Sequence, residues 1–305
     1  MVQHIEGLIA APFTAFHSDG EVNLNIIEQQ AEFLHRNGVC GAFICGSTGE
    51  GHSLTVAERI DIARRWMDVA AEDSQVIVHV GHNAITACKT LASHAQQIGA
   101  YAVGAMAPFF FKPHSVEELV TFCREIASAA PELPFYYYHI PCMTGVNFPM
   151  ISFLETAADK IPNLTGIKYT YEGMMDFEQC LRFENGRFDM LFGRDEMLLS
   201  ALSLGVRGAV GSTYNFAAPL YPEMIRAFEA GDWEQARHLQ HKVVELIQLI
   251  ARISPAFLPA AKAIMKILDL DCGPVRPPLT NLTNEQTDTL QKELQKIGFF
   301  EYASK

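Results

Sequence analysis

A lysine inside an apolar segment is the strongest candidate for a reactive residue in this sequence. Lys168 lies in segment 164–170, between Ile167 and Tyr169. Removing an ammonium group from water is costly, so such a lysine must reach solvent, find a partner or lose its proton. A neutral lysine amine attacks carbonyl carbons and forms Schiff bases. The alternative is a lysine at a strand edge that reaches solvent.

Three consecutive tyrosines, Tyr136, Tyr137 and Tyr138, occupy a second apolar segment. Tyrosine is common in β-strands, so ordinary packing accounts for such a run. Side chains alternate along a strand, which places Tyr136 and Tyr138 on one face and Tyr137 on the other. A tyrosine at the strand end could instead transfer a proton, if a neighbour lowers its pKa from about 10.

Three further segments end in polar groups. Residues 46–51, GSTGEG, place Ser47 and Thr48 between glycines, where backbone N–H groups can turn toward a carboxylate. A plain tight turn has the same composition, and the Gly-Lys-Ser/Thr of a phosphate-binding loop does not follow. Residues 193–196, GRDE, suit a hydroxyl-rich ligand or the start of a helix. Residues 211–215, GSTYN, form another hydroxyl-bearing turn.

Eight short apolar segments lead to these groups, and each precedes a longer stretch with helical periodicity. They begin near residues 7, 41, 75, 102, 134, 164, 188 and 208. Several are apolar throughout, which is typical of parallel strands buried on both faces. The pattern predicts an α/β fold in which residues 1–228 form a catalytic (β/α)8 TIM barrel; a doubly wound sheet is the alternative. Active sites of such barrels lie at the carboxyl ends of the strands.

The pattern changes after residue 228. Segments 233–252, 259–268 and 284–296 have helical periodicity, with no strand between them. We therefore expect residues 229–305 to form a C-terminal three-helix extension packed on the barrel. Within the barrel, residues 55–58 (TVAE) match a capping box at the start of a helix.

The composition narrows the classes of function. The chain has 305 residues with a formal net charge of −12, and this acidic balance argues against nucleic acid as the main partner. No apolar segment approaches the ~18 residues of a membrane span, and the N-terminus lacks the features of a secretory signal. Seven widely spaced cysteines without a CxxC pair predict reduced thiols, and hence a cytoplasmic protein without membrane contact.

Two histidine pairs are weak candidates for metal ligands. His79 and His82 flank a strand end, and His238 and His241 lie three residues apart on a helix. Neither pair has a nearby third ligand or an HExxH frame. We expect packed or solvated histidines, with no metal and no cofactor.

The polar segments resemble a known family in their order and spacing. The segments that carry the resemblance are 46–50, 137–141, 166–168, 193–196 and 211–215. They are similar to motifs of the dihydrodipicolinate synthase / N-acetylneuraminate lyase superfamily of class I, Schiff-base aldolases, and the similarity covers essentially the whole chain. His139 and segment 107–113 (APFFFKP) resemble vertebrate-type members of the N-acetylneuraminate lyase branch.

The resemblance implies a set of site residues. Lys168 matches the Schiff-base lysine, and Tyr138 matches the catalytic proton donor and acceptor. Ser47 and Thr48 match the pair that holds the carboxylate of the pyruvyl group. The residues that match contacts to the sugar, its glycerol tail and its ring-derived hydroxyls are Thr170, Gly193, Asp195, Glu196 and Ser212.

The activity implied by the resemblance is reversible cleavage of N-acetylneuraminate, a sialic acid, to N-acetylmannosamine and pyruvate in sialic acid degradation. The family is usually tetrameric, so a homotetramer is implied. The alternatives are an enzyme for another 2-keto-3-deoxy sugar acid, a dihydrodipicolinate synthase, and a sensor barrel that binds sialic acid or pyruvate without turnover. Dihydrodipicolinate synthases carry Arg where this chain has Met143, and a Tyr in the loop that here reads Phe109, Phe110 and Phe111.

Overall fold

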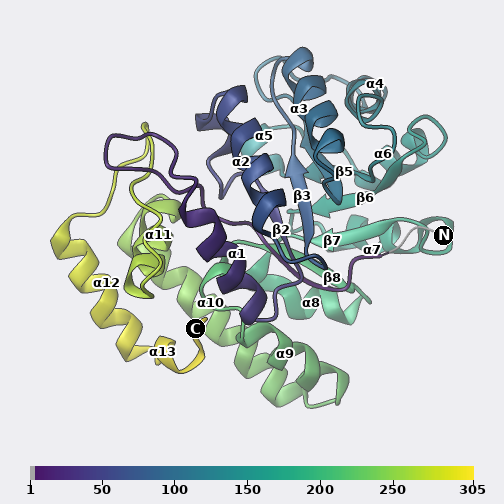
Figure 1. Ribbon diagram of the computed structural model, residues 1–305. Coiled ribbons are helices and arrows are strands. Elements are labelled where there is room, and N and C mark those ends of the chain that lie inside the picture. The colour runs from purple at the N-terminus through teal and green to yellow at the C-terminus, as the bar shows by residue number, and fades with distance from the viewer. Residues whose placement is uncertain (1–3) are drawn as a thin grey trace.

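The computed structural model describes residues 4–305, and its centre is a closed barrel of eight strands (Figure 1). All neighbouring strands pair in parallel and in chain order, and β1 closes on β8. The predicted (β/α)8 barrel is therefore confirmed. The strands are β1 (Gly7–Ala10), β2 (Gly41–Ile44), β3 (Gln75–His79), β4 (Ala102–Met106), β5 (Phe135–His139), β6 (Leu164–Tyr169), β7 (Asp189–Phe192) and β8 (Gly208–Gly211).

Helices alternate with the strands and cover the outside of the barrel (Figure 1). The capping box is present at α2, where the Thr55 hydroxyl accepts from the Glu58 N–H and the Glu58 carboxylate accepts from the Thr55 N–H at 2.7 Å. The helices up to the end of the barrel are α1 (Ile26–Arg36), α2 (Val56–Val69), α3 (Ile85–Gln97), α4 (Val116–Ala127), α5 (Pro141–Thr144), α6 (Met150–Ala157), α7 (Met174–Arg182), α8 (Leu198–Ser203) and α9 (Leu220–Glu229).

The alternation of side chains along the strands divides the core into two layers. Tyr136 and Tyr138 point into the barrel, where they join an apolar cluster with Phe43 and Leu191. Tyr137 points outward and stacks on a ring of α6, Phe153, with the centroids 4.7 Å apart. The predicted faces of the three tyrosines are confirmed, so the register that carries Tyr138 to the strand end is the one assumed from the sequence.

The C-terminal extension consists of α10 (Trp233–Ile253), α11 (Phe257–Ile267), α12 (Asn284–Lys296) and α13 (Phe299–Tyr302). The three predicted helices are present, and α10 packs on α8 and α9. The fourth, α13, was not predicted, because four residues are too few to display a helical period. In the described part of the chain no single helix is long and apolar enough to cross a membrane; α10 and α11 pass such a test only as a pair, bent by 111°.

The extension reaches back to the barrel at residues 46–51. Lys262 of α11 forms a buried ion pair with Glu50, with 2.7 Å between Nζ and Oε1. The backbone N–H of Arg276 donates to the other carboxylate oxygen of Glu50 at 2.9 Å, and the Arg276 guanidinium pairs with Glu58 of α2. The boundary expected between the barrel and the extension, at residues 228 and 229, falls at the end of α9. The contacts of Lys262 and Arg276 with Glu50 and Glu58 therefore join the extension to the barrel.

Candidate active site

Lys168 and Tyr138 lie side by side near the carboxyl ends of their strands. Tyr138 of β5 and Lys168 of β6 are partners in the strand register. The lysine side chain is only 4% exposed, and its Nζ lies 4.0 Å from the ring centroid of Tyr138 and 4.0 Å from that of Phe43. The amine therefore sits between two aromatic faces, which favour an ammonium group less than water does.

Burial lowers the pKa of Lys168 to about 7, and the carboxylate of Asp195 opposes part of that shift. A substantial fraction of this amine is thus neutral near pH 7, which is the state that attacks a carbonyl. The second buried lysine, Lys262, differs because it has Glu50 as a direct partner. Of these two buried lysines, Lys168 has the environment of a nucleophile.

Burial raises the pKa of Tyr138 to about 12, against the opposing effect of the Ser47 and Thr170 hydroxyls. The phenol therefore carries its proton at neutral pH. Its Oη lies 3.5 Å from Ser47 Oγ. Tyr136 occupies a deeper layer, where its hydroxyl donates to Asp189 Oδ2 at 2.8 Å. Only Tyr138 of the three tyrosines combines an inward direction with a place beside Lys168.

Residues 46–51 form a tight turn after β2 that carries Ser47 and Thr48. The turn is entered through Cys45 with φ at +55° and left through Glu50 with φ at +52°, a left-handed conformation that is unfavourable for residues other than glycine. Thr48 Oγ1 lies 2.6 Å from Ser212 Oγ, so the turn meets the loop after β8. Hydroxyl groups from both segments thus face the same end of the barrel as Lys168.

Thr170 and Gly193 form the neighbouring part of the rim, after β6 and β7. The Thr170 hydroxyl is buried and finds no hydrogen-bond partner among residues 4–305. A Cβ on Gly193 would lie 2.0 Å from this hydroxyl, so only glycine fits beside it. The Thr170 hydroxyl is thus enclosed between Gly193 and Tyr138, and it opposes the rise that burial causes in the pKa of Tyr138.

Asp195 is buried at the start of the short helix that follows β7. Its Oδ2 accepts from the Thr213 N–H at 3.0 Å and from the Thr213 hydroxyl at 2.6 Å. Its Oδ1 has no hydrogen-bond partner in the described part of the chain. Burial raises the pKa of this carboxyl to about 6, and the bonds from Thr213 oppose the rise. One carboxylate oxygen is therefore fixed by Thr213, and the other is buried against Gly211 of β8, where a Cβ would lie 2.0 Å from Oδ1.

Glu196 differs from the other predicted site residues in its contacts. Its side chain is one-third exposed and pairs with Arg194 at 3.3 Å, and Arg194 also pairs with Glu172. The contacts described above bring Ser47, Thr48, Tyr138, Lys168, Thr170, Gly193, Asp195 and Ser212 to one rim. Glu196 is next to Asp195 in the chain, but its carboxylate accepts a hydrogen bond from Arg194 and, within residues 4–305, makes no hydrogen bond with the other predicted site residues.

Two aromatic residues of the site were not identified from the sequence. Phe43 supplies one of the two rings around Lys168 Nζ, and His79 packs beneath Tyr138 with ring centroids 5.8 Å apart. The alternation of side chains along segment 41–45 could have identified Phe43, because it separates the positions that face into the barrel from those that face outward. His79 was weighed as a metal ligand and expected to be packed or solvated, but its place beside Tyr138 was not predicted. Within residues 4–305 no three His, Cys, Asp or Glu side chains are placed to hold a metal ion.

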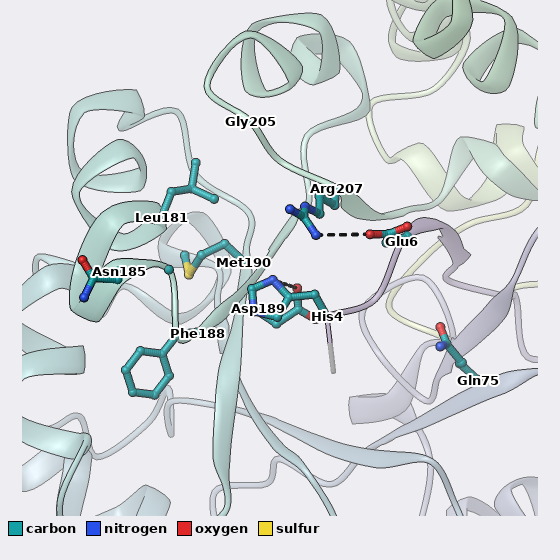
Figure 2. Close-up of a pocket in the computed structure, with 11 residues that line it drawn as sticks. His4, Glu6, Gln75, Leu181, Asn185, Phe188, Asp189, Met190, Gly205 and Arg207 are labelled. Carbon is teal, nitrogen blue, oxygen red and sulfur yellow. Dashed lines mark hydrogen bonds and ion pairs between the residues drawn. The ribbon is translucent and has the colours of Figure 1, made fainter. Parts of the chain in front are cut away.

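Two cavities lie near the ends of the barrel. A cavity of ≈ 240 Å³ adjoins Ser47 at the catalytic rim and is lined mainly by apolar residues, including Met106, Phe109, Met143 and Leu258. A larger one of ≈ 670 Å³ lies at the opposite, amino-terminal end of the strands (Figure 2). Figure 2 shows His4 facing Asp189 and Arg207 paired with Glu6 there. The second cavity does not include any of the predicted site residues.

A closed barrel with a buried lysine and its polar groups at the carboxyl rim defines an enzyme of the (β/α)8-barrel class. The sequence model of the dihydrodipicolinate synthetase family matches residues 4–297, and the chain belongs to that family. It is 39% identical to N-acetylneuraminate lyase of Homo sapiens over 302 residues, covering 98% of this chain and 94% of that protein.

Solved structures give the same relationship. N-acetylneuraminate lyase of Proteus mirabilis superimposes with a TM-score of 0.94 and 39% identity, covering 97% of this chain and 100% of that one. Dihydrodipicolinate synthase of Cyanidioschyzon merolae, bound to lysine, superimposes with a TM-score of 0.89 and 28% identity, covering 97% and 99%. The resemblance inferred from the motifs is confirmed, and the identity is higher to the two lyases.

Proposed function

We propose that this enzyme reversibly cleaves N-acetylneuraminate to N-acetylmannosamine and pyruvate, with Lys168 as its nucleophile. The observation that carries the proposal is the buried Lys168 amine, which lies between Phe43 and Tyr138 without a carboxylate in direct contact. The similarity to N-acetylneuraminate lyases along nearly the whole chain supports this substrate over the alternatives.

The first step joins the substrate to the protein. The neutral amine of Lys168 attacks the C2 ketone of open-chain N-acetylneuraminate, and loss of water from the carbinolamine leaves an iminium ion. The Ser47 and Thr48 hydroxyls hold the adjacent carboxylate, which supports the orientation of C2 toward Nζ. The iminium cation then accepts the electron pair of the bond that breaks.

The second step breaks the bond between C3 and C4. Tyr138 takes the proton of the C4 hydroxyl, the C3–C4 electron pair moves into an enamine, and N-acetylmannosamine leaves as an aldehyde. Because the pKa of Tyr138 is about 12, its hydroxyl takes this proton as its own proton passes to the substrate carboxylate, in one relay that leaves no free tyrosinate. Protonation of the enamine at C3 and hydrolysis release pyruvate and regenerate Lys168.

The rim formed after β6, β7 and β8 suits the polyol end of the substrate. In our proposal the Thr170 hydroxyl and the Asp195 carboxylate bind substrate hydroxyls, and neither Thr170 Oγ1 nor Asp195 Oδ1 has a hydrogen-bond partner within residues 4–305. Ser212, Gly193 and Glu196 complete this region in our proposal. The role of these groups is to bind and orient, while the covalent chemistry belongs to Lys168 and Tyr138.

Glu196→Gln is expected to raise the KM for N-acetylneuraminate more than it impairs formation of the pyruvate adduct. The substitution removes a charged acceptor for vicinal hydroxyls, and it also loosens the pair with Arg194. Steady-state kinetics and borohydride trapping with pyruvate measure the two effects separately. An equal loss in both assays would contradict a role confined to the polyol end.

The choice of aldehyde distinguishes the proposed lyase from a dihydrodipicolinate synthase. Met143 lines the apolar cavity beside Ser47, where those enzymes would offer an Arg to the carboxylate of aspartate semialdehyde. A charge left unpaired in such a site costs several kcal/mol. We expect N-acetylmannosamine to condense with pyruvate and the semialdehyde to react only at background rate. Efficient condensation with the semialdehyde would overturn the assignment and leave the role of Lys168 intact.

Pyruvate release from a panel of sialic acids and 2-keto-3-deoxy sugar acids tests the proposed function directly. Release from N-acetylneuraminate is the expected result. Release from another sugar acid alone would favour a sister enzyme, and binding of sialic acid without release would favour the sensor. We further propose, from the family resemblance and the cysteine pattern, a cytoplasmic homotetramer that needs no metal or cofactor. Light scattering and activity after chelation test the assembly and the metal requirement.

A further inference from the structure

His79 is a buried polar residue that the proposed reaction does not use. It is the last residue of β3, it points into the barrel, and it is 1% exposed. Its ring stands perpendicular to that of Tyr138 and also packs on Phe43, with centroids 5.8 Å and 5.7 Å away. It thus contacts both aromatic side chains that surround the Lys168 amine.

The imidazole has one short hydrogen bond. Nδ1 lies 3.1 Å from the carbonyl oxygen of Cys45. Nδ1 also lies 3.4 Å from Nη2 of Arg59, which can only donate. We assign the proton to Nδ1 from the shorter contact, because the Cys45 carbonyl oxygen can only accept and Nη2 already donates to the His79 carbonyl oxygen at 2.5 Å. Nε2 is buried and has no hydrogen-bond partner within residues 4–305. A Cβ on Gly81 would lie 2.9 Å from Nε2, so the chain after β3 also closes tightly around this ring.

Arg59 of α2 fixes the imidazole in place and keeps it neutral. Its guanidinium is buried, and it donates to the carbonyl oxygen of His79 at 2.5 Å and to that of Gly81 at 3.0 Å. Burial, and secondarily the charge of Arg59, hold the pKa of His79 well below its ordinary value. The ring therefore remains a single-proton donor at neutral pH.

Cys45, whose carbonyl oxygen accepts the hydrogen bond from His79 Nδ1, has an unfavourable backbone conformation. Cys45 has φ at +55° and directly precedes the turn of residues 46–51. A non-glycine residue in the left-handed region persists only where its surroundings hold it. The His79 bond reaches the Cys45 carbonyl, which is the peptide group that leads into Gly46 and Ser47.

We propose that His79 is a positioning residue that holds the turn of residues 46–51 in its ligand-binding geometry, through the hydrogen bond from Nδ1 to the Cys45 carbonyl. The inference rests on the proposed function, in which Ser47 and Thr48 of this turn bind the carboxylate of the oxo acid. His79 itself does not touch substrate. Its loss affects how tightly pyruvate is held, and the chemistry at Lys168 is affected less.

Two substitutions separate the hydrogen bond from the packing of the ring. His79→Asn places an amide N–H close to the position of Nδ1, whereas His79→Phe keeps a ring of similar size without a donor. In condensation of pyruvate with N-acetylmannosamine, we expect the Phe variant to raise the KM for pyruvate roughly tenfold, with kcat changed less than about threefold. The Asn variant is expected within about twofold of the original protein in both constants.

A wild-type KM in the Phe variant would overturn the proposal, and so would an Asn variant as impaired as the Phe variant. Should the Phe variant fail to fold, His79→Gln replaces it, because its amide lies near the Nε2 position and away from the Cys45 carbonyl. The exposed His238 of α10, changed to Asn, is the matched control with unaltered kinetics.

Borohydride trapping at graded pyruvate concentrations gives a second measure that needs no aldehyde. The half-saturating concentration should rise in the Phe variant and stay low in the Asn variant. If the unaltered protein traps pyruvate but does not cleave sialic acid, the proposed substrate is wrong. The trapping of pyruvate by the Phe and Asn variants can still be compared, so the role of His79 is still tested. A protein that traps no pyruvate would overturn both proposals.

Discussion

Lys168→Ala is expected to reduce turnover of N-acetylneuraminate to background, because it removes the amine that forms the iminium ion. In the unaltered protein, borohydride and pyruvate together should add one reduced pyruvyl group to the peptide that contains Lys168. Mass spectrometry of the digested protein identifies the modified peptide. Since the pKa of Lys168 is about 7, its amine is protonated below that pH, and the trapping rate should rise as the pH increases through about 7.

Lys262 is an internal control for this experiment. Its side chain is as buried as that of Lys168, and burial lowers its pKa, but its Nζ is held by Glu50 and by the carbonyl oxygen of Pro274 at 2.7 Å. Burial alone therefore predicts adducts on both lysines, whereas our proposal predicts an adduct on Lys168 only. Modification of Lys262, or of no lysine, would refute the assignment of the nucleophile.

Tyr138→Phe is expected to lower kcat by roughly 10² or more, the usual contribution of a positioned general acid or base. The substitution removes the one phenol beside the Lys168 amine and keeps the ring that packs against it. Some Schiff base should still be trapped with pyruvate, because that adduct does not require removal of the C4 proton. Steady-state kinetics combined with borohydride trapping distinguish these two steps.

The neighbouring tyrosines supply matched controls with different expected defects. Tyr137→Phe should leave kcat nearly unchanged, because Tyr137 faces the helices and stacks on Phe153. Tyr136→Phe should mainly reduce stability, by about 1–3 kcal/mol, since it removes one of the two donors to Asp189 Oδ2 and leaves the Ile5 N–H as the other. Thermal melts report the stability change. If Tyr137→Phe damaged kcat more than Tyr138→Phe, the assignment of the proton-transfer group would be wrong.

The barrel and the places of Lys168 and Tyr138 follow from local patterns in the sequence. Parallel strands buried on both faces are apolar throughout, so an isolated lysine or a terminal tyrosine stands out within them. Alternation then determines which tyrosine shares the face of the lysine. The closed, parallel order of strands places all carboxyl ends at one rim, which is why the sequence alone allows residues from distant segments to be grouped there.

The contacts within the rim could not be predicted in the same way. The bond between Thr48 and Ser212 joins residues 164 positions apart, and no local pattern reports such a distance. The sequence likewise did not reveal that Thr213 donates a hydrogen bond to one carboxylate oxygen of Asp195. It also did not reveal the ion pair between Arg194 and the Glu196 carboxylate. These arrangements depend on the packing of loops, whose conformations are set by tertiary contacts.

The contacts of Glu50 with α11 and Arg276 have a consequence for the order of events during protein synthesis. The turn that holds Glu50 emerges from the ribosome early, yet a partner of its carboxylate, Arg276, lies 226 residues further along the chain. Removing one partner of a buried ion pair is strongly destabilising, so we expect the turn to reach its final form only after Lys262 has been synthesised. Domains generally fold as units during synthesis, and this barrel includes contacts from both ends of the chain. In this protein a turn that is made early pairs with residues that are made near the end of synthesis, so we expect the growing polypeptide to gain activity only when synthesis is nearly complete.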